Sequence, residues 1–228
     1  MDESLSQTAK KALKATAPIF AGYLALGFGF GVLMYAHGYP AWLAVLMSCV
    51  IYAGSGQYVA VELLSGGATL LICALTTLFV NARHLFYGVS MLEKFQGAGW
   101  RKPYMIFALT DETYALLCST QTQDKTYCFL ICLFDHLYWI AGGALGALLG
   151  PVLPFPTQGI DFTLTALFVT IFLEQWLTSD RHLPALIGVG VTALSLVLFG
   201  SEHFLLPAMA IILALILLLQ RREAKRCG

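Results

Sequence analysis

The sequence carries little charge and has no long hydrophilic stretch. Only 11% of its 228 residues are charged, whereas 58% are hydrophobic, and the mean hydropathy is +0.76. Soluble domains carry about 25% charged residues, so these values exclude an ordinary soluble protein. The short connections between apolar runs also leave no room for a separate catalytic domain outside the membrane. We therefore expect an integral membrane protein.

Several signatures of other protein classes are absent. Acidic and basic residues balance at 13 each, and no basic stripe with interleaved aromatics indicates a nucleic-acid partner. There is no nucleotide-binding loop and no zinc-binding His-Glu-x-x-His helix, and Ala53 replaces the first glycine of the rhomboid-type Gly-x-Ser-Gly motif that Ser55 would need. Cys128, Cys132 and His136 recur at steps of four, but a metal site needs a fourth ligand. We predict no enzyme activity, no cofactor and no metal.

Apolar runs of membrane-spanning length fill most of the chain. A helix needs roughly 20 mainly apolar residues to cross a bilayer. We predict an all-α polytopic membrane protein with about eight hydrophobic helices, one or two of them broken or re-entrant. Residues 1–16 are expected to form a cytoplasmic amphipathic segment, 17–220 a single transmembrane domain and 221–228 a basic cytoplasmic tail. The expected helices are 17–36, 41–65, 68–91, 103–119, 126–150, 161–178, 183–200 and 203–220.

The distribution of basic residues leaves two topologies open. Lysines before the first run and arginines after the last predict that both termini are cytoplasmic, which requires an even number of crossings. Eight crossings would place Lys94, Arg101 and Lys102 outside, against the positive-inside tendency. Six crossings, with 41–65 and 103–119 entering the membrane and returning, would place them inside.

The end of the 68–91 run carries an amide, an arginine and a histidine. A charged side chain in hydrocarbon costs several kcal/mol unless it is paired or hydrated. If this run is one continuous helix, Asn81 and His84 share one face, and Arg83 and Tyr87 lie on the adjacent face. We interpret this strip as the lining of a cavity. The alternative is that Arg83 snorkels to the membrane interface.

A second candidate lies inside the 41–65 run. Gly54 and Gly56 surround Ser55, which weakens a helix, and Tyr52 and Gln57 flank the three. The half-helix after such a break presents free N–H groups that suit a substrate carboxylate. The alternative is that small residues only let a neighbouring helix approach closely.

Three of the acidic residues within apolar runs are candidates for the site, namely Asp111, Glu112 and Asp135. A carboxyl group shielded from water can carry a proton or pair with a buried cation such as Arg83. Adjacent residues on a helix point about 100° apart, so we expect at most one of Asp111 and Glu112 to face the same cavity as Arg83. Asp135 remains a candidate for proton relay or ion pairing, and His84 for proton coupling.

Three motifs together carry a family resemblance. They are Ile51-Tyr52-Ala53-Gly54-Ser55-Gly56-Gln57-Tyr58, Arg83-His84-x-x-Tyr87-Gly88 and Leu109-Thr110-Asp111-Glu112. In order and spacing they resemble the AzlC family, the large subunit of bacterial branched-chain amino acid exporters. The resemblance implies export of leucine, isoleucine and valine, with methionine as a further candidate, across the bacterial inner membrane. It also implies use of the proton gradient and a small hydrophobic AzlD-like partner subunit.

We therefore expect an apolar amino acid to bind beside the break in the 41–65 run. Two other functions remain open: transport of another small amino acid or an organic anion, and a non-transporting membrane subunit. The predicted substrate-binding residues are Tyr52, Gly54, Ser55, Gly56, Gln57, Asn81, Arg83 and Tyr87. The predicted proton-coupling or ion-pairing residues are His84, Asp111, Glu112 and Asp135.

Overall fold

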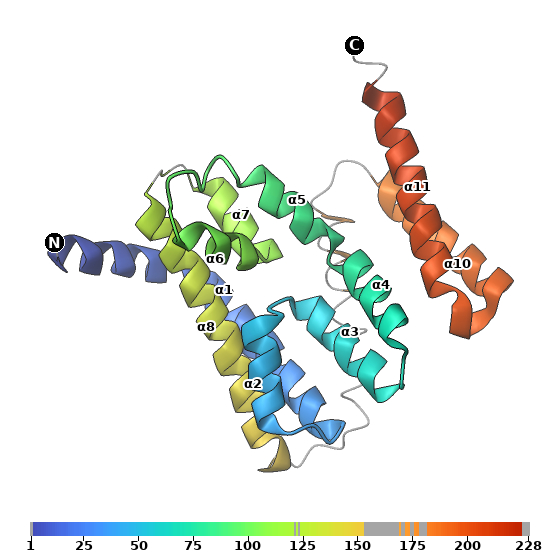
Figure 1. The fold of residues 1–228 in the computed structure, drawn as a ribbon, viewed down its shortest axis with the longest axis horizontal. Coiled ribbons are helices and arrows are strands. Elements are labelled where there is room, and N and C mark those ends of the chain that lie inside the picture. The colour runs from blue at the N-terminus through green and yellow to red at the C-terminus, as the bar shows by residue number, and fades with distance from the viewer. Residues whose placement is uncertain are drawn as a thin grey trace.

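The computed structural model describes residues 2–152 except 121 and 123, residues 182–224, and residues 169, 172, 173, 176 and 177. All regular elements in these ranges are helices, as predicted (Figure 1). Three helical segments of the described part are long and apolar enough to span a membrane, namely Leu5–Ala36, Lys125–Val152 and Leu183–Gly200. One bent helix pair meets the same criterion when its two helices are taken together. The predicted count of about eight helices is not confirmed. The expected helix 161–178 lies largely outside the described residues.

Two long helices, α1 (Asp2–Ala36) and α8 (Lys125–Leu149), pack side by side and run in the same direction (Figure 1). Glycines bring their backbones into contact. A Cβ added at Gly31 would lie 2.2 Å from the carbonyl oxygen of Gly143, and one at Gly146 would lie 2.0 Å from that of Phe28. Without a hydrophobic driving force between helices in lipid, such close backbone packing holds the pair together.

The 41–65 run forms two helices, α2 (Ala41–Val50) and α3 (Gly54–Ser65), so its predicted interruption is confirmed. The break lies at 51–53 and centres on Tyr52, whose φ is 42°. A non-glycine residue in this region costs on the order of 1–3 kcal/mol. The buried Tyr52 ring, 4.2 Å from the His136 ring centroid, offsets that cost.

The two glycines of this run have a different role from the predicted one. They open α3 instead of unwinding it. A Cβ at Gly54 would lie 3.1 Å from the Trp139 ring, and one at Gly56 would lie 2.6 Å from Asn81 Nδ2. Because these two residues have no side chain, the Trp139 ring of α8 and the Asn81 side chain can pack directly against the start of α3.

The expected continuous helix 68–91 is wrong. It forms α4 (Leu70–Val80) and α5 (Ala82–Ser90), which are bent by 44°. Asn81 ends the first helix and precedes the second, with φ −98° and ψ 6°. The polar stripes drawn on a straight helix therefore do not continue across the bend.

The 103–119 run forms a third broken pair, α6 (Arg101–Phe107) and α7 (Asp111–Ser119). Thr110 caps α7, because its hydroxyl accepts a hydrogen bond from the Thr113 backbone N–H at 3.3 Å. Such a cap satisfies one of the free donors of the first turn. Asp111 and Glu112 therefore occupy a helix N-terminus, not the middle of a span.

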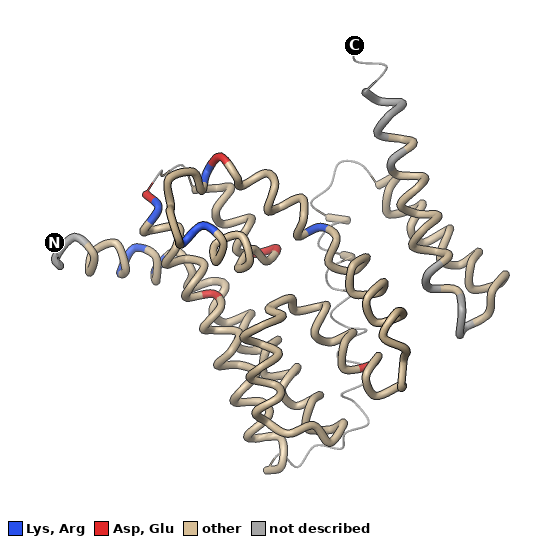
Figure 2. Tube along the Cα trace, in the orientation of Figure 1, with Lys and Arg blue, Asp and Glu red and all other residues tan. Residues whose placement is uncertain are grey.

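Basic residues gather at one end of the helix bundle, the end that holds the N-terminus (Figure 2). Lys125 Nζ donates to the Lys94 carbonyl at 2.6 Å, and Arg101 Nη1 donates to Thr126 Oγ1 at 3.2 Å. Lys94 Nζ also donates to the carbonyl of Thr120, just after α7. The start of α6, the end of α7 and the start of α8 thus lie at the same end.

The α6–α7 pair accordingly enters the bundle from the basic end and returns to it. The α2–α3 pair enters from the opposite end and returns there (Figure 1). Between the two ends run α1, the bent α4–α5 pair and α8. In the first 152 residues, the arrangement thus agrees with the topology in which 41–65 and 103–119 do not cross.

The remaining described helices, α10 (Leu183–His203) and α11 (Leu205–Ala224), form a pair that contacts the bundle at α4 (Figure 1). Gly200, with φ 72°, interrupts α10 near its end. Large apolar side chains such as Val197, 82% exposed, cover the outer surface of α10. Such a surface suits contact with lipid.

Candidate functional site

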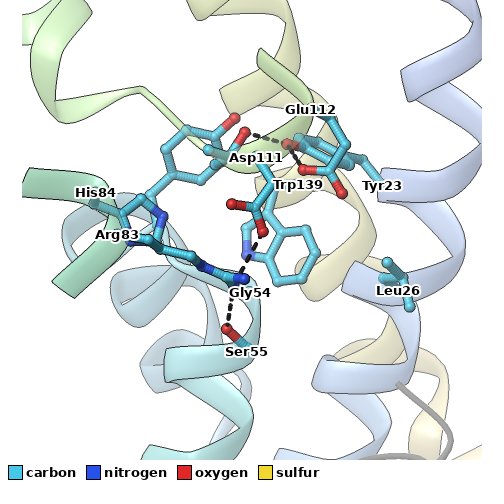
Figure 3. Close-up of a pocket in the computed structure, with 11 residues that line it drawn as sticks. Tyr23, Leu26, Gly54, Ser55, Arg83, His84, Asp111, Glu112 and Trp139 are labelled. Atoms are coloured by element: carbon cyan, nitrogen blue, oxygen red, sulfur yellow. Dashed lines mark hydrogen bonds and ion pairs between the residues drawn. The ribbon is translucent and has the colours of Figure 1, made fainter. Parts of the chain in front are cut away.

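The three helix breaks meet in one pocket beside the packed α1–α8 pair (Figure 3). The residues come from the middle of α1 and α8 and from the starts of α3, α5 and α7. The cavity has a volume of about 50 Å³, which is room for a few water molecules but not for an amino acid. The site is therefore closed around its own side chains. Its lining consists of Tyr23, Leu26, Tyr52, Gly54, Ser55, Arg83, His84, Thr110, Asp111, Glu112 and Trp139.

An ion pair lies at the centre of the pocket. Arg83 Nη2 is 3.0 Å from Asp111 Oδ2, and the same nitrogen donates to Ser55 Oγ at 3.0 Å. Tyr87 donates its hydroxyl proton to Asp111 Oδ1 at 2.7 Å. The Arg83 side chain extends into the pocket towards these partners (Figure 3). The three sequence motifs therefore converge on one pair of opposite charges.

Both adjacent carboxylates line the pocket, so the expectation that at most one would do so is wrong. The expectation assumed the middle of a continuous helix, whereas Asp111 and Glu112 lie in the first turn of α7. Glu112 Oε2 accepts a hydrogen bond from the Tyr23 hydroxyl at 2.8 Å. The positive end of the helix dipole favours carboxylates here by about 0.3–1 kcal/mol each.

The other predicted binding residues divide into two groups. Tyr52, Gly54, Ser55 and His84 belong to the lining, and His84 Nδ1 lies 3.2 Å from the Asn81 carbonyl oxygen. Four predicted residues lie behind the lining, where they position other groups. Gly56 admits the Asn81 side chain, Tyr87 binds Asp111, and Gln57 Oε1 accepts a hydrogen bond from Trp139 Nε1 at 2.8 Å.

Sequence reasoning did not assign Tyr23, Leu26, Thr110 and Trp139 to the site. Tyr23 and Trp139 interrupt long apolar runs with a polar atom on a buried ring, and such atoms usually find a partner. Their hydrogen bonds to Glu112 and Gln57 follow that rule. This polar atom on an otherwise apolar ring is the one sequence signal that could have identified Tyr23 and Trp139.

Asp135 lies outside the pocket lining and is fully buried on α8. Thr113 donates its hydroxyl proton to Asp135 Oδ2 at 2.8 Å, whereas Oδ1 has no hydrogen-bond partner. No lysine or arginine of the described residues forms an ion pair with it. Its neighbour His136 contacts the Ser48 carbonyl through Nε2 at 3.2 Å and the Tyr104 hydroxyl through Nδ1 at 3.0 Å.

A bundle of apolar helices with three breaks around a charged pocket defines a polytopic membrane protein, with the broken-helix geometry that transporters use to bind solutes. The chain belongs to the AzlC family, because residues 18–153 match the family described as AzlC protein. The predicted family is thus confirmed.

Relatives agree with that assignment. The Branched-chain amino acid transport protein AzlC of Bacillus subtilis is 42% identical over 93% of this chain and 85% of the relative. An uncharacterized membrane protein of Helicobacter pylori strain J99 is 42% identical over 94% of this chain and 96% of its own length. Inner membrane protein YgaZ of Escherichia coli is 30% identical over 75% and 74%, respectively. No solved structure matches the chain significantly. All three relatives are named as membrane or transport proteins, which supports a role in membrane transport.

Proposed function

We propose that this protein exports branched-chain amino acids across the bacterial inner membrane, driven by the proton gradient and assisted by a small AzlD-like subunit. Leucine, isoleucine and valine are the proposed substrates, with methionine as a further candidate. Family membership and the name of the Bacillus subtilis relative support this proposal. The observation that carries it is the Arg83–Asp111 ion pair at the meeting point of three broken helices.

An amino acid zwitterion can replace this ion pair without leaving a charge unpaired. Its carboxylate would bind Arg83 and the N–H groups at the start of α3, while its ammonium would bind Asp111. Opening the pair without a replacement would leave two unpaired charges in the pocket, so an exchange of partners is the low-energy way to open it. Leu26 and Trp139 line the same cavity and offer apolar contacts to an aliphatic side chain.

The proposed orientation places the basic end of the bundle in the cytoplasm. Lys94, Arg101 and Lys125 gather there with the N-terminal part of α1, which follows the positive-inside rule. Both termini are proposed to be cytoplasmic. Labelling single cysteines introduced at Lys10 and Glu93 with an impermeant maleimide tests this, because both should react only after the inner membrane is opened.

Transport of labelled leucine into proteoliposomes tests the substrate site, with and without the small neighbouring subunit. Arg83→Gln and Asp111→Asn should each abolish transport. The double variant should recover thermal stability relative to the single ones, because no lone charge remains, but not transport. Glu62→Gln on the exposed side of α3 is the matched control and should transport normally. Normal leucine transport by either single variant would refute the proposed role of the pair.

Competition by three ligands with the same aliphatic side chain but different charged groups distinguishes the alternative functions. Leucine carries both charges, its 2-keto acid only the carboxylate, and leucinamide only the ammonium. Leucine should compete best, because it alone satisfies both Arg83 and Asp111. Equal competition by the keto acid would indicate an organic-anion transporter. Absence of transport by every substrate, also with the small subunit present, would indicate a non-transporting subunit.

A further inference from the structure

A row of hydroxyl groups connects the pocket with the buried Asp135. Starting at Glu112, the contacts run through the Tyr23 hydroxyl, 2.8 Å from Oε2, to Thr110 Oγ1. Thr110 then donates to Thr113 Oγ1 at 2.9 Å, and Thr113 donates to Asp135 Oδ2 at 2.8 Å. The row joins α1, the α6–α7 break, α7 and α8, and it ends in a carboxyl group at each side.

The number of protons in this row does not match the number of contacts. Four oxygen–oxygen contacts are linked by three hydroxyls, and each hydroxyl has one proton to donate. If both carboxyls are ionised, Tyr23 donates to Glu112 while Thr110 and Thr113 donate towards Asp135. The contact between Tyr23 and Thr110 then has no proton, and two buried lone pairs face each other. Buried polar groups without a partner are costly.

One additional proton completes every contact in the row. On Glu112, it makes all three hydroxyls donate towards Asp135; on Asp135, it makes all three donate towards Glu112. The two arrangements contain the same four hydrogen bonds in opposite directions. The row therefore has a place for one proton, which can reside at either end.

The surroundings of the two ends differ. Asp135 faces Tyr52 from the α2–α3 break, Tyr23 from α1, Glu112 from α7 and Cys132 on its own helix, with no cation among these neighbours. Glu112 instead lines the pocket beside Arg83 and Asp111. A rearrangement of the ion pair therefore changes the electrostatic potential at Glu112 more than at Asp135.

We propose that Glu112 and Asp135 share one proton through Tyr23, Thr110 and Thr113, and that Asp135 is the inner proton-holding residue of the transporter. This inference rests on the proposed proton-coupled transport. In the transfer, Glu112 gives its proton to Tyr23, and each hydroxyl passes its own proton forward until Asp135 receives one. One negative charge moves from Asp135 to Glu112, and no other bond changes.

The test is a comparison of Thr113→Val with Thr113→Ser in proteoliposomes. Valine has the shape of threonine without its hydroxyl, so it interrupts the row, whereas serine keeps the hydroxyl. Leucine transport driven by a pH gradient should fall on the order of tenfold or more in the valine variant, because proton transfer is lost. Leucine exchange at equal pH should stay near the wild-type rate, since it needs no net proton movement. The serine variant should restore gradient-driven transport.

Two results would overturn the proposal. One is wild-type gradient-driven transport by Thr113→Val. The other is loss of leucine exchange by this variant when gel filtration and thermal unfolding show a folded protein, because Thr113 would then serve substrate binding or structure.

An infrared measurement does not depend on transport. The carbonyl stretch of a protonated, hydrogen-bonded carboxyl group should be present in the wild type and disappear in the Glu112→Gln/Asp135→Asn double variant. It should shift in Thr113→Val but not in Thr113→Ser. Absence of this band in the wild type would refute the shared proton. Presence of the band in a protein that moves no leucine would instead refute the proposed function and leave the shared proton in place.

Discussion

Tyr52 combines a well-packed ring with a hydroxyl that has no hydrogen-bond partner. The hydroxyl is buried beside Asp135 and Thr113, and it forms no well-aligned hydrogen bond to either. A buried polar group left unsatisfied costs about 1–3 kcal/mol. Tyr52→Phe removes that group and keeps the ring contacts with His136 and Phe107. We therefore expect the free energy of unfolding to rise by about 1 kcal/mol, at the low end of that range.

Tyr58→Phe is the matched control. Tyr58 is also fully buried, but its hydroxyl donates to the Leu26 carbonyl at 2.7 Å. The Leu26 carbonyl keeps its backbone partner within α1, so Tyr58→Phe removes one additional hydrogen bond. The free energy of unfolding should fall by about 0.5–1.5 kcal/mol. The same chemical change should therefore have opposite signs at the two positions.

Thermal unfolding of the purified variants in detergent gives the comparison. A change of 1 kcal/mol corresponds to roughly 2–4 °C for a chain of this size, so Tyr52→Phe should unfold later and Tyr58→Phe earlier than the wild type. Leucine transport should nevertheless fall in Tyr52→Phe, because Tyr52 belongs to the pocket lining and the change removes its one polar side-chain atom. A lower unfolding temperature for Tyr52→Phe would refute the reasoning, since it would mean that the hydroxyl is satisfied in the folded protein.

Two further changes test the packing and the ion pair. Gly146→Ala places a Cβ 2.0 Å from the Phe28 carbonyl oxygen and should lower the free energy of unfolding by about 1–3 kcal/mol. Gly22→Ala, with nothing within 4 Å, should not lower the unfolding temperature, because alanine favours the helix more than glycine does. Equal melting of the two variants would contradict the close α1–α8 packing. Tyr87→Phe removes a donor to Asp111 and should raise the KM for leucine about tenfold, since a hydrogen bond to a charged group contributes about 1.5–3 kcal/mol. An unchanged KM would show that Tyr87 does not orient Asp111 for binding.

The three helix breaks differ in how visible they are in the sequence. The acidic pair marked the α6–α7 break, because charges are costly within a span, and small residues marked the α2–α3 break. The residue that breaks the latter is Tyr52, whose positive φ depends on ring packing against His136 and leaves no local signal. Residues 77–85, around the α4–α5 bend, contain neither proline nor glycine. The contact of Asn81 with Gly56 is tertiary. Local sequence therefore could not locate it.

The charged part of the site was predictable and its aromatic part was not. Arg83, Asp111 and Glu112 are recognisable because charges within apolar runs are expensive and therefore usually functional. Tyr23 and Trp139 lie on helices that are apolar on all sides, so no periodicity shows which face points inward. The hydroxyl row to Asp135 was equally hidden, because its members come from four different elements that only the fold brings together.

The two members of the central ion pair depend on each other unequally. Asp111 lies in the first turn of α7, where free N–H groups and the helix dipole favour a carboxylate, and Tyr87 also donates to it. Arg83 lies in the first turn of α5, where the same dipole disfavours a cation, and its other partner is the neutral Ser55 hydroxyl. When the pair opens, Asp111 keeps favourable partners, whereas Arg83 loses its one counter-charge. An arriving carboxylate therefore stabilises the open pocket more than an arriving ammonium does. In the proposed mechanism, the substrate carboxylate would therefore be the group that separates the pair, and the ammonium would then take the place of Arg83 beside Asp111.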